Sequence, residues 1–187
     1  MVNPGYPSDH LQRFIAETGA PARALELGCG AGANLEWLCR NVPRPVGGHD
    51  LGIERDEALA DFARRRLAGN ADIITADMTA GLPCSAEMFE LVFDIEAIYQ
   101  NDMPAIKAII PEVRRVLKPG GWFFGQMMRS AYASDRPDWS VGWRFSYSEL
   151  RTLFRDFEAL EIDEAMRTSG NGSRRLKEWL VRARKPA

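Results

Sequence analysis

The chain has 187 residues, with 24 basic and 26 acidic side chains and a formal net charge of −2. This length fits one domain with a buried core, and the balanced charge argues against a protein that coats nucleic acid or an anionic membrane. No apolar run approaches the roughly 20 residues that cross a bilayer, and the N-terminal stretch lacks the pattern of a secretory signal. Three scattered cysteines, Cys29, Cys39 and Cys84, favour a reducing cytoplasm, and no Cys/His pair has the spacing of zinc ligands. We therefore expect a cytoplasmic, metal-free protein that forms a single domain over residues 1–187.

Apolar runs alternate with stripes of helical period between about Ala22 and Gly125. The predicted strands are Ala22–Leu27, Pro45–His49, Ala71–Ala76, Phe89–Ile95 and Trp122–Met128. The predicted helices lie around Leu35–Val42, Ala58–Arg66 and Ile106–Leu117. Asp102 is the expected N-cap of the third helix, and Lys118–Gly121 is expected to end it. The alternation predicts a parallel sheet with helices on both faces.

The pattern changes after the fifth strand. Residues 130–141 are polar with isolated aromatics and are expected to form a loop or lid. Ser146–Glu149 is a capping box that opens a short helix. Phe157–Ile162 and the alternating stretch Trp179–Arg184 are two further expected strands. Because only a loop joins them, we expect them to pair antiparallel.

A glycine-rich loop lies between the first strand and the first helix of the alternating region. Ala24–Leu27 is followed by glycines at 28, 30 and 32, and the helix begins near Asn34. Glycine lets the backbone adopt positive φ and approach a ligand closely. Open α/β sheets bind ligands at this carboxyl end of the strands. The loop is therefore the expected ligand site.

Two ligands compete for this loop. Gly28-x-Gly30-x-x-Ala33 also matches the dinucleotide fingerprint, with Asp50 as the ribose partner at the end of the second strand. Glu26 favours S-adenosylmethionine, because its carboxylate can meet the amino group of the methionine moiety but would repel a pyrophosphate. Asp77 can accept a hydrogen bond from the adenine amino group, and a dehydrogenase would need more chain for its substrate half. An NAD(P)-dependent oxidoreductase and a non-catalytic S-adenosylmethionine-binding module remain the alternatives.

Four segments together resemble class I S-adenosylmethionine-dependent methyltransferases, particularly small bacterial enzymes that act on small molecules. They are Leu25–Gly32, Gly48–Gly52, Phe89–Val92 and Val116–Gly121. The resemblance implies a Rossmann-like, doubly wound, seven-stranded sheet that is mostly parallel, with the last strand antiparallel. It also implies that residues 1–20 cover the cofactor and that residues 129–147 face the acceptor.

The resemblance assigns the cofactor site residue by residue. Asp50 would hold both ribose hydroxyls, Met78 would lie against the adenine ring, and Asp94 would line the cofactor. The expected ligand is S-adenosyl-L-methionine, with S-adenosyl-L-homocysteine as product. The predicted cofactor-binding residues are Glu26, Gly28, Cys29, Gly30, Asp50, Leu51, Asp77, Met78, Asp94 and Ile95.

Methyl transfer is an in-line displacement at a methyl group that is already activated. Orientation can supply about 7–11 kcal/mol, and a base is needed only when the nucleophile must lose a proton. Glu96 and Tyr99, in the segment after the fourth strand, are the candidate catalytic residues, because they could orient the acceptor or take its proton. The alternative is that Glu96 is solvated and Tyr99 packs.

The expected acceptor is a small molecule, and oxygen, nitrogen, sulfur and carbon acceptors all remain open. An aromatic group after the fifth strand either walls the acceptor pocket or packs against the last helix. It consists of Tyr132, Trp139, Trp143, Phe145 and Tyr147. Six basic residues between Arg174 and Lys185 are read as a solvated face and not as an RNA-binding surface, because no aromatic stacking platform is interleaved with them. No membrane partner is expected, and the sequence leaves the oligomeric state open.

Overall fold

The computed structural model describes residues 5, 7–45, 47–129, 142–168 and 175–187. In chain order, the elements are α1 (Asp9–Thr18), β1 (Ala24–Leu27), α2 (Ala33–Asn41), β2 (Asp50–Glu54), α3 (Glu57–Leu67), β3 (Ala71–Thr75), η1 (Met78–Ala80), β4 (Phe89–Ile95), η2 (Ile98–Gln100), α4 (Met103–Val116), β5 (Leu117–Met128), α5 (Tyr147–Leu153), β6 (Glu158–Thr168) and β7 (Arg175–Arg184).

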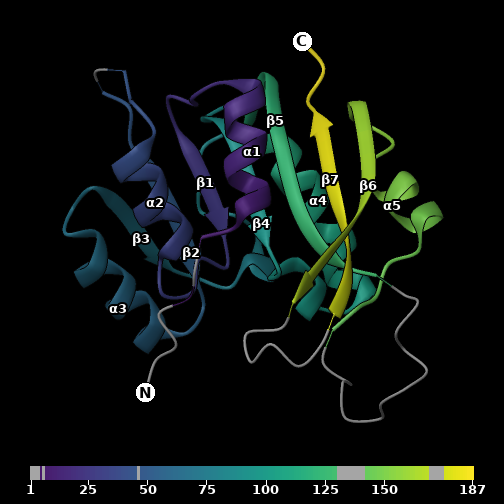
Figure 1. Ribbon diagram of the computed structural model, residues 1–187, viewed down its shortest axis with the longest axis horizontal. Helices are drawn as coiled ribbons and strands as arrows, with labels where there is room; N and C mark the ends of the chain where they lie inside the picture. Colours follow the sequence, from purple (N-terminus) through teal and green to yellow (C-terminus); the bar gives the residue numbers. More distant parts are fainter. Residues whose placement is uncertain (1–4, 6, 46, 130–141, 169–174) are drawn as a thin grey trace.

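In this described part, seven strands form one sheet in the order β3-β2-β1-β4-β5-β7-β6. β1 pairs parallel with both β2 and β4, while β7 runs antiparallel to β5 and to β6. The arrow of β7 accordingly points against that of its neighbour β5 in Figure 1. The expected mostly parallel sheet with an antiparallel last strand is confirmed.

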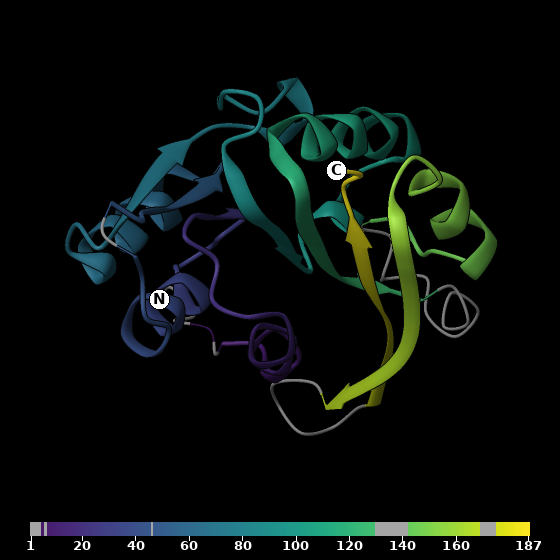
Figure 2. The same cartoon turned by 90° about the horizontal axis from the view of Figure 1, so that it is seen from above.

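Helices cover both faces of the sheet, as the strand–helix alternation predicts. Figure 2 shows α1, α2 and α3 on one face and α4 and α5 on the other. Leu35 and Leu38 of α2 join Phe14 of α1 in one buried cluster. Ile106 and Ile109 of α4 belong to the other. Each face therefore has its own apolar core, and the strands separate the two.

Side chains cap four of the described α-helices, α1 through Ser8 among them, and the caps of α4 and α5 are those that the sequence predicts. Asp102 accepts a hydrogen bond from the backbone N–H of Ala105 at the start of α4. Asp56 caps α3 in the same way. At α5, Ser146 and Glu149 form the expected capping box.

Four predicted strands have a boundary that is wrong by several residues, and one of them is β7, which begins at Arg175 and not at Trp179. The second strand is Asp50–Glu54 and not Pro45–His49, so Asp50 begins the strand instead of following it. β5 begins at Leu117, directly after α4, and includes the Lys118–Gly121 segment that was expected to be a turn. β6 runs from Glu158 to Thr168, beyond the expected end at Ile162.

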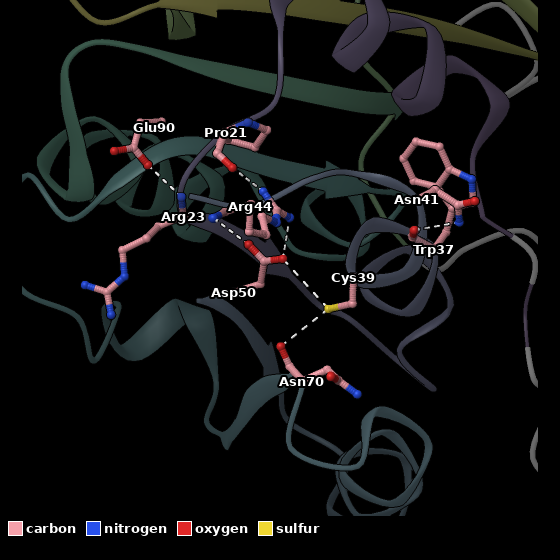
Figure 3. A network of polar contacts seen from close by, with 10 residues as sticks. Pro21, Arg23, Trp37, Cys39, Asn41, Arg44, Asp50, Asn70 and Glu90 are labelled. Atoms are coloured by element: carbon pink, nitrogen blue, oxygen red, sulfur yellow. Dashed lines mark hydrogen bonds and ion pairs between the residues drawn. The ribbon is translucent and has the colours of Figure 1, made fainter. Parts of the chain in front are cut away.

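A polar network joins the amino ends of β1 and β2, at the edge of the sheet opposite the one that carries the glycine loop. Figure 3 shows the side chains of this network. The Asp50 side chain is 2% exposed. It accepts a hydrogen bond from the backbone N–H of Ala24 at 2.9 Å and forms an ion pair with Arg44. Arg44 also donates to the carbonyl of Pro21. Asp50 therefore joins the first residue of β2 to the first residue of β1.

None of the described helices is both long enough and apolar enough to cross a bilayer.

The Asp50 network generates a prediction about stability. Asp50→Ala should lower the free energy of unfolding by about 3–5 kcal/mol, because it leaves the Arg44 charge without a partner in a mostly buried site. Asp50→Asn keeps an oxygen that can accept from Ala24 and should lose less. Urea denaturation followed by circular dichroism measures both. Wild-type stability for Asp50→Ala would contradict the role assigned to the network.

Candidate functional site

A cleft of about 310 Å³ opens at the carboxyl ends of β1, β2, β3 and β4. The loops after four separate strands contribute to it, as expected for a ligand site in an open α/β sheet. Its lining residues are Gly28, Gly30, Ile53, Glu54, Arg55, Asp56, Leu59, Ala76, Asp77, Met78, Ala97, Gln100 and Asn101.

Gly28 brings the loop after β1 against the turn after β4. Its φ is +64°, and a Cβ built on it would lie 2.3 Å from the Cβ of Ala97. Any side chain at this position would collide with that turn. Gly30 also has a positive φ, of +53°, but a Cβ there would meet nothing within 4 Å. The first glycine thus allows two loops to approach closely, whereas the second is required within the protein only by its left-handed conformation, at a position that lines the cleft.

Glu54, at the carboxyl end of β2, is an acid of the cleft that the sequence analysis missed. Its side chain is largely buried, and its Oε2 accepts the backbone N–H of Gly30 at 2.8 Å. Its Oε1 accepts the N–H of Asp56 at 2.9 Å. A short apolar run, Leu51–Ile53, between two acids and just before the Asp56 cap could have located the strand and its terminal carboxylate.

The expected role of Asp50 as ribose ligand is wrong in its geometry. Asp50 lies at the start of β2, where its carboxylate pairs with Arg44, and it does not line the cleft. Leu51 is likewise a core residue of β2, and Ile53 takes the position at the cleft. The error arose because the predicted strand was placed five residues too early, which exchanged the two ends of β2.

Glu26 is a fully buried carboxylate, and one of its two oxygens has no hydrogen-bond partner among the described residues. Its Oε1 accepts a hydrogen bond from Nδ2 of Asn34 at 2.6 Å. Its Oε2 is buried and has no hydrogen-bond partner among the described residues. Burial raises the pKa of Glu26 to about 8, and the nearby carboxylates of Asp94 and Glu54 add to the rise. An ammonium group that reached Oε2 would supply the missing partner and charge.

Asp77 and Met78 line the cleft after β3, as predicted. Asp77 is exposed and caps η1, and the N–H and hydroxyl of Thr79 donate to its Oδ1, which lowers the pKa of Asp77. The Cε of Met78 lies 3.5 Å from the point that a Cβ on Gly28 would occupy. Met78 and the glycine loop therefore lie within contact distance at the cleft, and an apolar ring there would meet the Met78 side chain.

Asp94 lies behind the cleft and does not line it. Its Oδ1 accepts the backbone N–H groups of Ala97 and Ile98, each at 2.9 Å, and so shapes the turn after β4. Its Oδ2 is buried without a described partner, and burial raises the pKa of Asp94 to about 7. The side chain of Cys29 belongs to the apolar core, and that of Ile95 packs against it. Neither residue lines the cleft. Cofactor contacts of these three residues stay predictions.

Glu96 and Tyr99 flank Ala97, which lines the cleft. Glu96 has a positive φ of +65°, and its Oε1 lies 3.4 Å from Nε2 of Gln126 at the end of β5. Tyr99 is partly buried against the core that contains α4. The structure places both residues in the turn after β4, next to the cleft, and their catalytic roles stay predictions.

The aromatic group after β5 divides into packing residues and residues outside the described part. Phe145 is fully buried, which supports the packing alternative for this residue. The Tyr147 ring lies 6.0 Å from that of Trp179 on β7 and is half exposed. Tyr132 and Trp139 fall outside the described residues, as does most of the expected lid over 129–147.

Part of the basic tail is paired on the surface. Arg182 forms an ion pair with Glu17 of α1, and Lys185 with Glu87. Arg184 lies over the ring of Trp122. Within the described ranges, no group of three or more His, Cys, Asp or Glu side chains is arranged to hold a metal ion.

The contact between Gly28 and Ala97 generates a prediction. Gly28→Ala should lower the free energy of unfolding by roughly 2–4 kcal/mol, from left-handed strain and overpacking together. Gly30→Ala is the matched control, because its new methyl group meets open space and only the strain of about 1–2 kcal/mol remains. Adding Ala97→Gly to Gly28→Ala should restore part of the loss. Equal destabilisation by the two alanine substitutions in urea denaturation would contradict the close approach.

Known proteins share this sequence pattern and this fold. Residues 24–121, just over half of the chain, match the family described as "Methyltransferase domain". The fatty-acid O-methyltransferase of Mycolicibacterium smegmatis is 33% identical over 143 residues, which cover 71% of this chain and 49% of that protein. A phthiotriol/phenolphthiotriol dimycocerosates methyltransferase of Mycobacterium tuberculosis is 29% identical over 162 residues, covering 86% of this chain and 55% of that protein. The chain thus spans about half the length of these curated relatives.

Solved structures share the fold over nearly the whole chain. The N-methyltransferase NodS from Bradyrhizobium japonicum, in complex with S-adenosyl-l-homocysteine, superposes with a TM-score of 0.73 at 21% identity, covering 95% of this chain and 85% of that one. An S-adenosylmethionine-dependent methyltransferase from Methanosarcina mazei has a TM-score of 0.74 at 17% identity, covering 97% and 99%. With the matched domain, the sheet order and the glycine loop, the chain belongs to the class I S-adenosylmethionine-dependent methyltransferases.

Proposed function

We propose that this chain binds S-adenosylmethionine in the cleft at the carboxyl edge of the sheet and transfers its methyl group to a small-molecule acceptor. The observation that carries the proposal is the orphaned, buried Oε2 of Glu26 behind the glycine loop. A cationic group of the ligand satisfies it, whereas a pyrophosphate would be repelled by Glu26 and by Glu54.

Residues that line the cleft, together with Glu26, which is buried behind the glycine loop, bind different parts of the ligand. Glu26 binds the ammonium group of the methionine moiety. Glu54 takes over the role first expected of Asp50 and accepts hydrogen bonds from the ribose hydroxyls, since it is the acid that ends β2. Asp77 accepts from the adenine amino group, and Met78 packs against the ring. The backbone at Gly28 and Gly30 lies close to the ligand because neither residue carries a side chain.

When bound, the cofactor supplies a methyl group activated on a sulfonium centre. The chain orients the acceptor on the side of the turn after β4, where Glu96 and Tyr99 lie. The positive φ of Glu96 and the hydrogen bond from the Gln126 amide hold its carboxylate at the end of β5. There it accepts the proton of an acceptor hydroxyl or amine, and an acceptor that has no proton to lose needs only orientation.

The acceptor that we propose is a small molecule with an apolar body. Two relatives are named for fatty-acid and phthiotriol methyl transfer, which supports lipid-like acceptors. The partly buried rings of Tyr99 and Trp143 pack against the core next to the cleft and offer apolar surface.

Cofactor binding tests the proposal directly. Isothermal titration calorimetry should detect S-adenosylhomocysteine binding that Glu54→Ala weakens by roughly 10- to 100-fold, since hydrogen bonds to a charged group contribute about 1.5–3 kcal/mol. Asp50→Asn, at the other end of β2, is the matched control and should bind like the wild type. Binding of NADH but not of S-adenosylhomocysteine would move the protein to the oxidoreductases.

The base role of Glu96 has its own test. Acceptors are found by incubating lipid-like alcohols, acids and amines with S-adenosylmethionine labelled in its methyl group. For an acceptor that must lose a proton, Glu96→Gln should lower kcat by about 10²- to 10⁴-fold while S-adenosylhomocysteine still binds. Lys107→Ala, at an exposed position on the following helix α4 and outside the cleft lining, controls for general disturbance. Unchanged turnover of Glu96→Gln would remove Glu96 from the mechanism.

A further inference from the structure

The buried Glu26 carboxylate is held by a side chain that is itself held by the N-terminal segment. Nδ2 of Asn34, in the first turn of α2, donates to Glu26 Oε1 at 2.6 Å. Oδ1 of the same amide accepts the backbone N–H of Ser8 at 2.8 Å. Glu26 and Asn34 are both almost completely buried.

The Ser8 N–H determines which way the Asn34 amide faces. An amide side chain can turn over and exchange its oxygen and its NH₂ group. With the Ser8 donor in place, the oxygen is taken, and the NH₂ group must face Glu26. Without that donor the oxygen can turn toward Glu26, where it repels the ionised carboxylate and accepts a hydrogen bond only from the protonated form.

Ser8 is fixed in turn by the helix that it begins and by the sheet. Its Oγ accepts the N–H of Leu11 at 3.2 Å as the N-cap of α1. The same hydroxyl donates to Oε1 of Gln126 at 3.0 Å, and Gln126 donates to Glu178 at 2.7 Å. Docking of α1 against the sheet therefore presents the Ser8 N–H to Asn34.

We propose that Asn34, oriented by the Ser8 N–H, is a positioning residue that keeps one oxygen of Glu26 free for the ammonium group of the cofactor. The proposal rests on the proposed function and adds a coupling to it. Docking of α1 and binding of the amino acid end of the cofactor then favour each other, because both depend on the same amide orientation.

Ionisation of Glu26 links this coupling to pH. The groups that face Glu26 are Asp94 on β4, Glu54 on β2 and the thiol of Cys29, and none of them is a cation. Since burial raises the pKa of Glu26 to about 8, the carboxyl is mostly protonated at neutral pH in the free protein. An ammonium ligand favours the ionised form, so affinity should rise with pH between 6 and 8, by at most about tenfold per pH unit.

Removing the Asn34 donor should raise the pKa of Glu26 further, because the hydrogen bond from Nδ2 stabilises the ionised form. Asn34→Leu should therefore weaken S-adenosylhomocysteine binding by on the order of 10- to 100-fold at pH 7, with a loss that shrinks toward pH 8.5. A purely structural defect would weaken binding by the same factor at every pH. Asn41→Ala, at the exposed end of α2, is the matched control.

A pair of substitutions at Ser8 isolates the backbone N–H. Ser8→Ala removes Oγ but keeps the N–H, whereas Ser8→Pro removes both. Proline fits the φ of −69° at this N-cap, so it introduces little backbone strain there. We expect Ser8→Pro to reproduce the pH-dependent loss of Asn34→Leu, and Ser8→Ala to keep the pH dependence of the wild type.

The experiment is calorimetric titration of each folded variant, checked by circular dichroism, with two ligands at pH 6, 7, 8 and 8.5. The second ligand, 5′-methylthioadenosine, has adenine, ribose and sulfur but no amino acid group, so its affinity should not depend on Asn34 or Ser8. Equal losses for both ligands, or wild-type binding of S-adenosylhomocysteine by Asn34→Leu and Ser8→Pro, would overturn the proposal. If the wild type bound neither ligand, the proposed function itself would fail and this coupling with it.

Discussion

Parallel pairing of β1 with β2 on one side and β4 on the other is the constraint on which the site depends. Leu27, the last residue of β1, is opposite Ile53 of β2 and Asp94 of β4. The three strands therefore end at the same level, and the residues that follow them meet at one edge. Gly28, Glu54 and Ala97 come from separate parts of the chain and line one cleft for this reason. A shift of either neighbour by one residue would turn its side chains to the opposite face of the sheet.

Buried acids at the amino edge and at the carboxyl edge of the sheet differ in their charge partners and hydrogen bonds. At the amino edge, Asp50 is neutralised by Arg44 and bonded to the backbone of β1, so its charge is satisfied within the protein. At the carboxyl edge, the ion pairs among the described residues include neither Glu26 nor Asp94, and each keeps one oxygen without a hydrogen-bond partner. Leaving a buried carboxylate oxygen unsatisfied costs free energy that a bound cation can recover. This contrast supports the proposal that Glu26 serves a ligand, whereas Asp50 is satisfied within the protein.

The N-terminal helix contributes to both the core and the site. Phe14 of α1 stacks on Phe124 of β5 with ring centroids 5.0 Å apart, which fixes the helix against the sheet. The N-cap of the same helix carries the Ser8 N–H that orients Asn34. Packing of an apolar side chain and the geometry of a buried carboxylate are thus linked through one short helix.

The elements and site residues that the sequence predicts correctly are those marked by strong local patterns of hydrophobicity and capping. The alternation of apolar runs with helical stripes predicts the sheet class, and the short connection between the last two strands predicts their antiparallel pairing. The predicted strand Phe89–Ile95 has its observed bounds, because five of its seven residues are apolar and Leu91–Phe93 form an uninterrupted apolar run at its centre. The caps at Asp102 and Ser146 follow from side-chain hydrogen bonds within one turn. Gly28, Asp77 and Met78 were placed at the cleft because they follow strands whose ends were clear.

The local pattern left two candidate runs for β2, and the position of the site acid depends on the choice between them. The apolar run at Pro45–His49 resembled a strand, but β2 is selected by pairing with β1 and β3, which only the folded chain provides. Asp50 and Glu54 stand four residues apart in similar surroundings, and only the register shows which one faces Arg44 and which one faces the cleft. The contact of Ser8 with Asn34 joins residues 26 positions apart, and that of Ser8 with Gln126 spans 118. The sequence by itself determined the type and order of the elements, which arise from short-range periodicity and capping. The tertiary structure decided which acid pairs with Arg44, which lines the cleft and which is buried without a charged partner, because burial and charge pairing depend on neighbours that are distant in the chain.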